Sequence, residues 1–152
     1  MCYNYIGDNM GILNIAIVLF IIIELSNVII LYFKPDFKYG NGVGVFKDFL
    51  ETKGTSKILI DYLTNWVAGV KLIFIAQLFV VLFFNNLLLK QMTVLVIIFS
   101  VLTYFFRLHK IIKKLDKMGR LKVKGYSKTL DMMIISIILV FTVALVLSTG
   151  II

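Results

Sequence analysis

The sequence has very few of the residues on which disulfide bridges, metal sites and polar active sites depend. Its 152 residues include one cysteine, Cys2, one histidine, His109, and eight acidic side chains. A lone cysteine excludes a disulfide within the chain, and one cysteine with one histidine cannot make a Cys/His zinc site. The sequence also lacks a Ser/His/Asp set, a carboxylate pair and an HExxH helix, so we expect no enzyme activity, metal or cofactor.

What the chain has in abundance is apolar side chains. Hydrophobic residues make up 61% of the sequence, and the mean hydropathy is +1.00. Soluble globular domains contain roughly 45–50% apolar residues, so this composition argues against a soluble enzyme or a soluble binding module. A chain this apolar is also unlike disordered proteins, which have low hydrophobicity. The composition therefore predicts an integral membrane protein.

Four apolar runs are long enough to cross a bilayer, whose hydrocarbon core of about 30 Å requires roughly 20 helical residues. The predicted spans are residues 11–33, 66–84, 88–106 and 132–152. The third reaches this length only if Lys90 turns its ammonium group outward. The predicted fold is an all-α bundle of four transmembrane helices, forming a single domain over residues 1–152.

Basic residues are concentrated in two connections between the predicted spans. Residues 34–65 carry five Lys and Arg residues, and residues 107–128 carry nine. With four spans, both connections lie on one side of the membrane, and short basic loops stay in the cytoplasm. We therefore expect a multi-pass protein of the cell membrane with both chain ends outside.

Both connections contain segments with helical periodicity. The apolar residues of 45–53 fall on one side of a predicted amphipathic helix, which suits the membrane interface. After Gly54, residues 55–65 are predicted to form a helix that runs directly into the second span. In the 107–128 connection, apolar residues recur every three or four positions, so the third span is predicted to continue as one helix to Met118.

The 107–128 connection also supplies one group of candidate contact residues. These residues are Arg107, His109, Lys110, Lys113, Lys114, Lys117 and Arg120. Basic groups near a bilayer attract anionic headgroups by about 1 kcal/mol each, and an acidic cytoplasmic protein is a further partner for them. Nucleic acid is not expected, because no nucleic-acid motif is present and no aromatic residues interleave the charges.

Glu24 is the acidic residue placed deepest in a predicted span. It lies about 14 Å from the basic end of its span at 1.5 Å per residue, where a bare carboxylate is costly and should face the bundle interior. Asn27 lies one turn further on, and Gln77 and Thr142 lie at similar depths in other spans. Lys71 lies nearer the surface and should turn toward it, so Gln77 is the expected partner and a Lys71 ion pair looks strained.

Three functions fit this pattern. The first is a small oligomeric pore or carrier for a small solute or ion, with Glu24, Asn27 and Gln77 facing the path. We expect a homo-oligomer, because four spans leave large apolar faces. The alternative is a non-transporting membrane subunit that docks a cytoplasmic partner through 34–65 and 107–128, with Glu24 a structural hydrogen-bonding group. The third is a lipid-headgroup enzyme that uses a polar cluster of Asp61, Tyr62, Arg107, His109 and Asp131.

Overall fold

The computed structural model describes residues 2–39 and 42–149, with side chains throughout these ranges except at positions 2–9 and 50. In chain order, its elements are the helices α1 (Cys2–Phe33), η1 (Val43–Val45), α2 (Asp48–Glu51), α3 (Thr55–Phe83), α4 (Leu87–Leu102), η2 (Thr103–Phe105), α5 (Leu108–Lys117) and α6 (Tyr126–Ser148). Four helical stretches are long and apolar enough to cross a membrane: Met10–Phe33, Thr55–Phe83, Leu87–Lys117 and Tyr126–Ser148. The predicted all-helical fold, with four helices long and apolar enough to cross a membrane, is confirmed.

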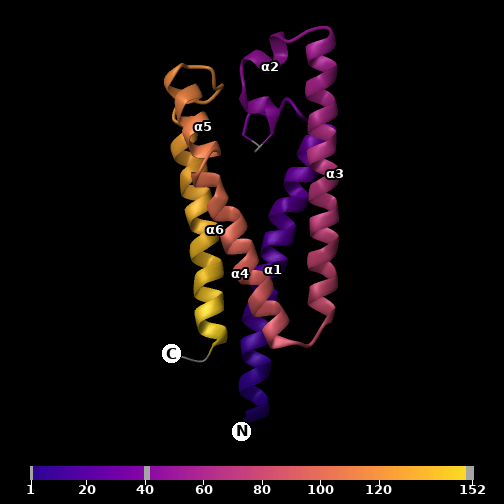
Figure 1. Ribbon diagram of the computed structural model, residues 1–152, viewed down its shortest axis with the longest axis vertical. Helices are drawn as coiled ribbons and strands as arrows, with labels where there is room; N and C mark the ends of the chain where they lie inside the picture. The colour runs from indigo at the N-terminus through magenta and orange to yellow at the C-terminus, as the bar shows by residue number, and fades with distance from the viewer. Residues whose placement is uncertain (1, 40–41, 150–152) are drawn as a thin grey trace.

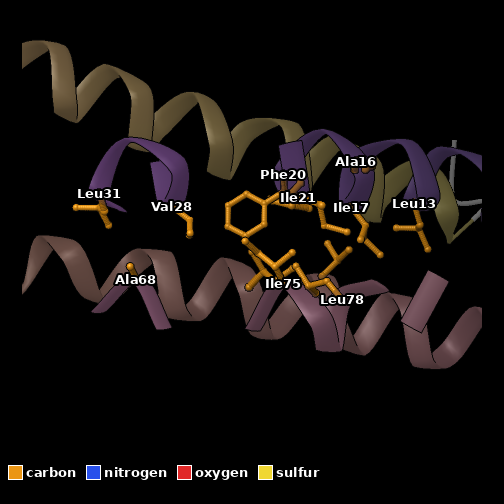
Figure 2. Packing of buried hydrophobic residues seen from close by; sticks show 14 residues of the cluster. Leu13, Ala16, Ile17, Phe20, Ile21, Val28, Leu31, Ala68, Ile75 and Leu78 are labelled. Atoms are coloured by element: carbon orange, nitrogen blue, oxygen red, sulfur yellow. The ribbon is translucent and has the colours of Figure 1, made fainter. Parts of the chain in front are cut away.

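Helix α1 lies at the centre of the bundle and packs against α3, α4 and α6 (Figure 1). Its buried face, which includes Ile17 and Ile21, meets Ile75 and Leu78 of α3 (Figure 2). The ring of Phe20 makes edge contacts with Phe74 of α3 and Phe141 of α6, at centroid distances of 6.1 and 5.3 Å. These rings fix the three helices in register halfway along the bundle, and each such pair contributes about 0.5–1.5 kcal/mol beyond its buried area.

The helix boundaries agree in part with those predicted. Helix α1 ends at Phe33, just before Lys34 and Pro35, because proline cannot continue a helix and restricts the residue before it. Helix α3 runs unbroken from Thr55 to Phe83, which confirms that residues 55–65 lead directly into the second span. Helix α6 begins six residues before the predicted position 132, and residues 150–152 of that predicted span lie outside the described residues.

The predicted continuation of the third span toward Met118 is confirmed in extent, because one membrane-length stretch runs from Leu87 to Lys117, but this stretch is not one regular helix. Helix α4 ends at Leu102, the 3-10 turn η2 follows, and Arg107 leaves helical geometry at φ −124° before α5 begins. Within η2, Tyr104 is buried and its hydroxyl donates a hydrogen bond of 2.8 Å to Asp131 of α6. This contact holds the turn against α6, and α5 then packs along α6.

The two connections pack onto each other at the end of the bundle away from the chain ends (Figure 1). We call the described residues of 34–54 and 119–125 the basic cap. An antiparallel bridge and two backbone hydrogen bonds join its halves: Phe46 with Leu121, Lys47 N to Arg120 O at 3.0 Å, and Lys122 N to Val45 O at 2.9 Å. Because the backbone at 45–47 is paired in this way, the amphipathic helix predicted over 45–53 is reduced to the four residues of α2.

Gly44 allows the first half of the basic cap to lie directly on the chain that leaves α1. A Cβ atom at this position would lie 2.5 Å from the Pro35 carbonyl oxygen and 2.6 Å from the Phe37 backbone nitrogen. The neighbouring Val45 is buried in a second apolar cluster, which includes Tyr104 and Leu121. This cluster fixes the cap above the ends of α4 and α6.

The start of α6 is held by a carboxylate from α5. Asp116 accepts hydrogen bonds from the backbone nitrogens of Gly125 and Ser127, at 3.0 and 3.1 Å, and from the Ser127 hydroxyl at 2.6 Å. A negative charge is favourable here, because the first N–H groups of a helix lack partners within the helix. The contact also ties the end of α5 to the start of α6.

Candidate functional site

A cavity of about 710 Å³ lies in the half of the bundle nearest the basic cap. Helices α1 and α3 form one side of it, and α4, η2, α5 and α6 form the other. Most of its walls are apolar, for example Leu31, Val67, Val101 and Ile134, and cap residues that include Phe46 close one end. The volume is within the range of about 300–1,000 Å³ that is typical of small-molecule sites.

An ion pair between two helices lies in the wall of this cavity. The Lys71 Nζ atom of α3 is 2.5 Å from the Glu24 Oε2 atom of α1, and the two side chains are 28% and 17% exposed. An ammonium group has three hydrogens and a carboxylate has a second oxygen. Elsewhere in the described chain, neither group forms another hydrogen bond, so both retain capacity to bind a ligand.

This pair replaces the expected contact between Glu24 and Gln77. The sequence gives the depth of each residue but not the direction in which it points around its helix. Helices α1 and α3 are neighbours, and the long aliphatic stem of Lys71 reaches across to Glu24 rather than to the surface. The pairing compensates a carboxylate that would be costly to leave bare at this depth.

The other predicted path residues lie apart from this pair. Asn27 is half-buried and is not part of the cavity wall. Gln77 and Thr142 are exposed on the outside of the bundle, and the Thr142 hydroxyl donates to the Ile138 carbonyl oxygen of its own helix at 2.7 Å. The structure therefore brings together Glu24 and Lys71, and it places Gln77 and Thr142 on an outer face.

Comparison with known proteins gives no guide to this site. No protein-family model, curated protein or solved structure matches the chain. Among the described residues, no three His, Cys, Asp or Glu side chains are grouped closely enough to hold a metal ion.

A second polar cluster lies beside the cavity, between η2, α5 and α6. His109 Nδ1 is 2.9 Å from Asp131 Oδ1, and the same oxygen accepts the hydrogen bond from Tyr104. The sequence suggested His109 and Asp131 but not Tyr104, whose role depends on the break in the helix. The other suggested members lie elsewhere: Asp61 pairs with Lys57 at 2.9 Å on α3, and Tyr62 is exposed there.

The basic candidates of the 107–128 connection are mostly free on the surface of α5. Those with exposed side chains and no ion pair in the described chain are Arg107, Lys110, Lys113, Lys114 and Lys117. Arg120 differs, because it pairs with Asp48 of the basic cap at 3.0 Å. Exposed apolar residues Leu108, Ile111 and Met118 lie among these charges, a combination typical of helices at a membrane interface.

Lys90, which was expected to turn outward, is instead fully buried near the start of α4, with 0% of its surface exposed. Its ammonium nitrogen has no hydrogen-bond partner among the side chains and backbone that the structure describes, and the same holds for Asn14 Oδ1 on α1. The next residue, Gln91, donates to the carbonyl and hydroxyl oxygens of Ser148, both at 3.2 Å. Helix α4 packs against both α1 and α6, and this packing encloses Lys90.

Proposed function

We propose that the chain is a membrane-embedded carrier that binds a small solute in the cavity and uses the Glu24–Lys71 pair as the polar end of the site. The observation that carries this proposal is an apolar cavity that reaches a pair of charged groups well inside two membrane-length helices. Glu24 is nine residues from the end of α1, about 14 Å along a helix. Ionisable groups at such depth commonly mark solute or ion paths.

The ion pair keeps the wall of the empty cavity neutral at this point. Without a solute, Lys71 compensates Glu24, so neither charge is left bare among apolar walls. A solute with a polar or charged group competes for the free donors of Lys71 or the free oxygen of Glu24. Its apolar part packs against the apolar walls of the cavity. We place the basic cap on the cytoplasmic side by its concentration of Lys and Arg. The exposed apolar outer faces of the bundle are available to further copies of the chain.

Electrical currents from proteoliposomes on a solid-supported membrane test this proposal. The probes are octyl sulfonate and octyltrimethylammonium, because permanently charged ions cross plain bilayers slowly. We expect at least one probe to give a current above that of empty liposomes. Lys71→Met should reduce a sulfonate current at least about tenfold, and Glu24→Gln should reduce an ammonium current to the same extent. Gln77→Leu, on the outer face, is the matched control and should keep the current. Currents equal to those of empty liposomes for both probes would overturn the carrier.

A second function is favoured by the exposed charge on α5 and by the pairing of both connections into one basic cap. We propose, as the alternative, that this surface docks an acidic cytoplasmic protein. The test is chemical cross-linking in intact membranes, followed by purification of the chain. A partner that is lost from Lys113→Gln/Lys114→Gln/Lys117→Gln, and retained by Gln77→Leu, would support docking. A cross-linking pattern unchanged by the triple substitution would refute it.

A further inference from the structure

We infer that the solute is a single-chain anionic amphiphile, such as an alkyl carboxylate or sulfonate, which enters the cavity sideways from the leaflet at the basic cap. This inference rests on the proposed use of the cavity as a solute site. It adds the charge of the solute and the route by which the solute enters.

The route follows from residues that belong both to the cavity wall and to the outer surface. Leu63 and Val67 of α3 line the cavity and are 47% and 42% exposed, and Leu108 of α5 lines the opposite side and is 57% exposed. The cavity therefore reaches the surface between α3 and α5, where the large exposed side chains of its lining are apolar. Ser100 and Thr103 also line the cavity and are exposed, and the Thr103 hydroxyl donates to the Ser100 carbonyl oxygen at 2.6 Å. An apolar rim on a membrane-length helix faces acyl chains, so a molecule already in the leaflet can enter without crossing water.

The charge of the solute follows from a cation that is next in the sequence to the rim residue Leu108. Arg107 directly precedes Leu108, at the turn between η2 and α5, and its guanidinium group is exposed with no hydrogen bond or ion pair to the described chain. A guanidinium group presents a planar fork of donors that matches a carboxylate or sulfonate. The 107–128 connection around it has nine basic residues and one acidic residue, a net charge of +8, and this field attracts anions and repels cations.

The interior of the cavity is consistent with the same charge. Glu24 is already compensated by Lys71, so the pair presents no net negative charge to an incoming cation. Lys71 retains two ammonium hydrogens for an acceptor. Arg107, next to Leu108, thus offers a cation near the opening, and Lys71 offers its free N–H donors deeper in the membrane, while the alkyl chain packs against the apolar walls.

Photo-labelling in nanodiscs of zwitterionic phosphatidylcholine tests the inference directly. The probe is a dodecyl carboxylate with a diazirine at its chain end, and the labelled positions are mapped by mass spectrometry. We expect adducts on cavity residues such as Val101 and Ile134. Dodecyl sulfonate should displace the probe, whereas dodecyltrimethylammonium and dodecanol at equal concentration should not.

Two pairs of matched variants separate the rim from the cavity. Arg107→Gln should raise the probe concentration for half-maximal labelling about three- to tenfold, whereas Lys117→Gln, an exposed cation at the far end of α5, should leave it unchanged. Ser100→Phe, which places a ring in part of the cavity, should weaken cavity labelling, and Val96→Phe on the outer face of α4 should not. Circular dichroism and size-exclusion chromatography confirm that each variant is folded.

The outcomes separate this inference from the proposed function. Displacement by the ammonium probe and not by the sulfonate would overturn the anionic class, while a current carried by octyltrimethylammonium would keep the carrier. Arg107-dependent cavity labelling without any current would support the inference and refute transport. Adducts confined to outer residues such as Val80 and Val140, or equal labelling of Arg107→Gln and Lys117→Gln, would overturn the inference.

Discussion

The Glu24–Lys71 pair makes a quantitative prediction about stability. Replacing Lys71 with Met keeps most of the side-chain volume and leaves the Glu24 carboxylate without its partner. Removing one member of a buried ion pair costs about 3–5 kcal/mol. Because the two side chains are 28% and 17% exposed, we expect a smaller loss of about 2–3 kcal/mol in the free energy of unfolding.

Two further variants, Glu24→Gln and Glu24→Gln/Lys71→Met, complete a double-mutant cycle for this pair. Glu24→Gln keeps a hydrogen-bond acceptor for Lys71, whose long stem can also turn toward the surface, so we expect a loss of about 1–2 kcal/mol. Glu24→Gln/Lys71→Met leaves no charge at the site. It should lose less than about 1 kcal/mol, because a neutral replacement of a buried ion pair is often close to neutral in stability.

The assay is reversible unfolding in mixed micelles, with sodium dodecyl sulfate as the denaturant and far-ultraviolet circular dichroism as the signal. Gln77→Leu on the outer face is the control and should change stability by less than about 0.5 kcal/mol. If the double variant loses the sum of the two single losses within about 0.5 kcal/mol, the residues are not coupled. That result would refute the ion pair and, with it, the argument that Lys71 neutralises Glu24 in the cavity wall.

Three further predictions concern residues outside the Glu24–Lys71 pair. Gly44→Ala places a methyl group against the backbone at residues 35–37 and should lower the melting temperature by several degrees. Gly11→Ala, whose methyl group would meet no described atom within 4 Å, should not lower it, and equal melting temperatures for the two variants would contradict the close approach. Asp116→Ala removes the hydrogen bonds at the start of α6 and should lower the free energy of unfolding by about 1 kcal/mol. The control Asp48→Ala removes an exposed ion pair and should lower it by less than about 0.5 kcal/mol, and similar losses for the two variants would argue against capping by Asp116. Lys90→Met replaces a buried ammonium that has no hydrogen-bond partner among the described residues with an apolar side chain of similar length. It should raise the melting temperature, and a lower value would contradict this reasoning.

The spans could be predicted from the sequence because crossing a bilayer requires a minimum length of apolar helix, and length can be counted along the sequence. A run of about 20 apolar residues is needed whatever the helix packs against, and the proline at position 35 fixes the end of α1. The break between α4 and α5 could not be predicted in this way. The apolar period from Leu108 to Met118 is compatible with one continuous helix, and the turn depends on Tyr104 reaching Asp131 on another helix.

The site was predictable in depth but not in direction. Hydropathy and helical rise place Glu24, Gln77 and Lys71 along their helices, but only the packing of α1 against α3 decides that Lys71 is the partner. The burial of Lys90 has the same origin, because it depends on how α4 crosses its neighbours. The basic cap depends on backbone pairing between segments about 75 residues apart, for which neither segment carries a local signal.

Because Phe46 pairs with Leu121, the basic cap cannot form until both of its halves have been synthesised. The ribosome adds about 5–20 residues per second, so the second half of the basic cap emerges roughly 4–15 s after the first. Glu24 and Lys71, in contrast, belong to two membrane-length helices that are synthesised before α4 and α6. The nascent hairpin of α1 and α3 can therefore enter the membrane with its two deepest charges already neutralised, before the rest of the cavity wall exists.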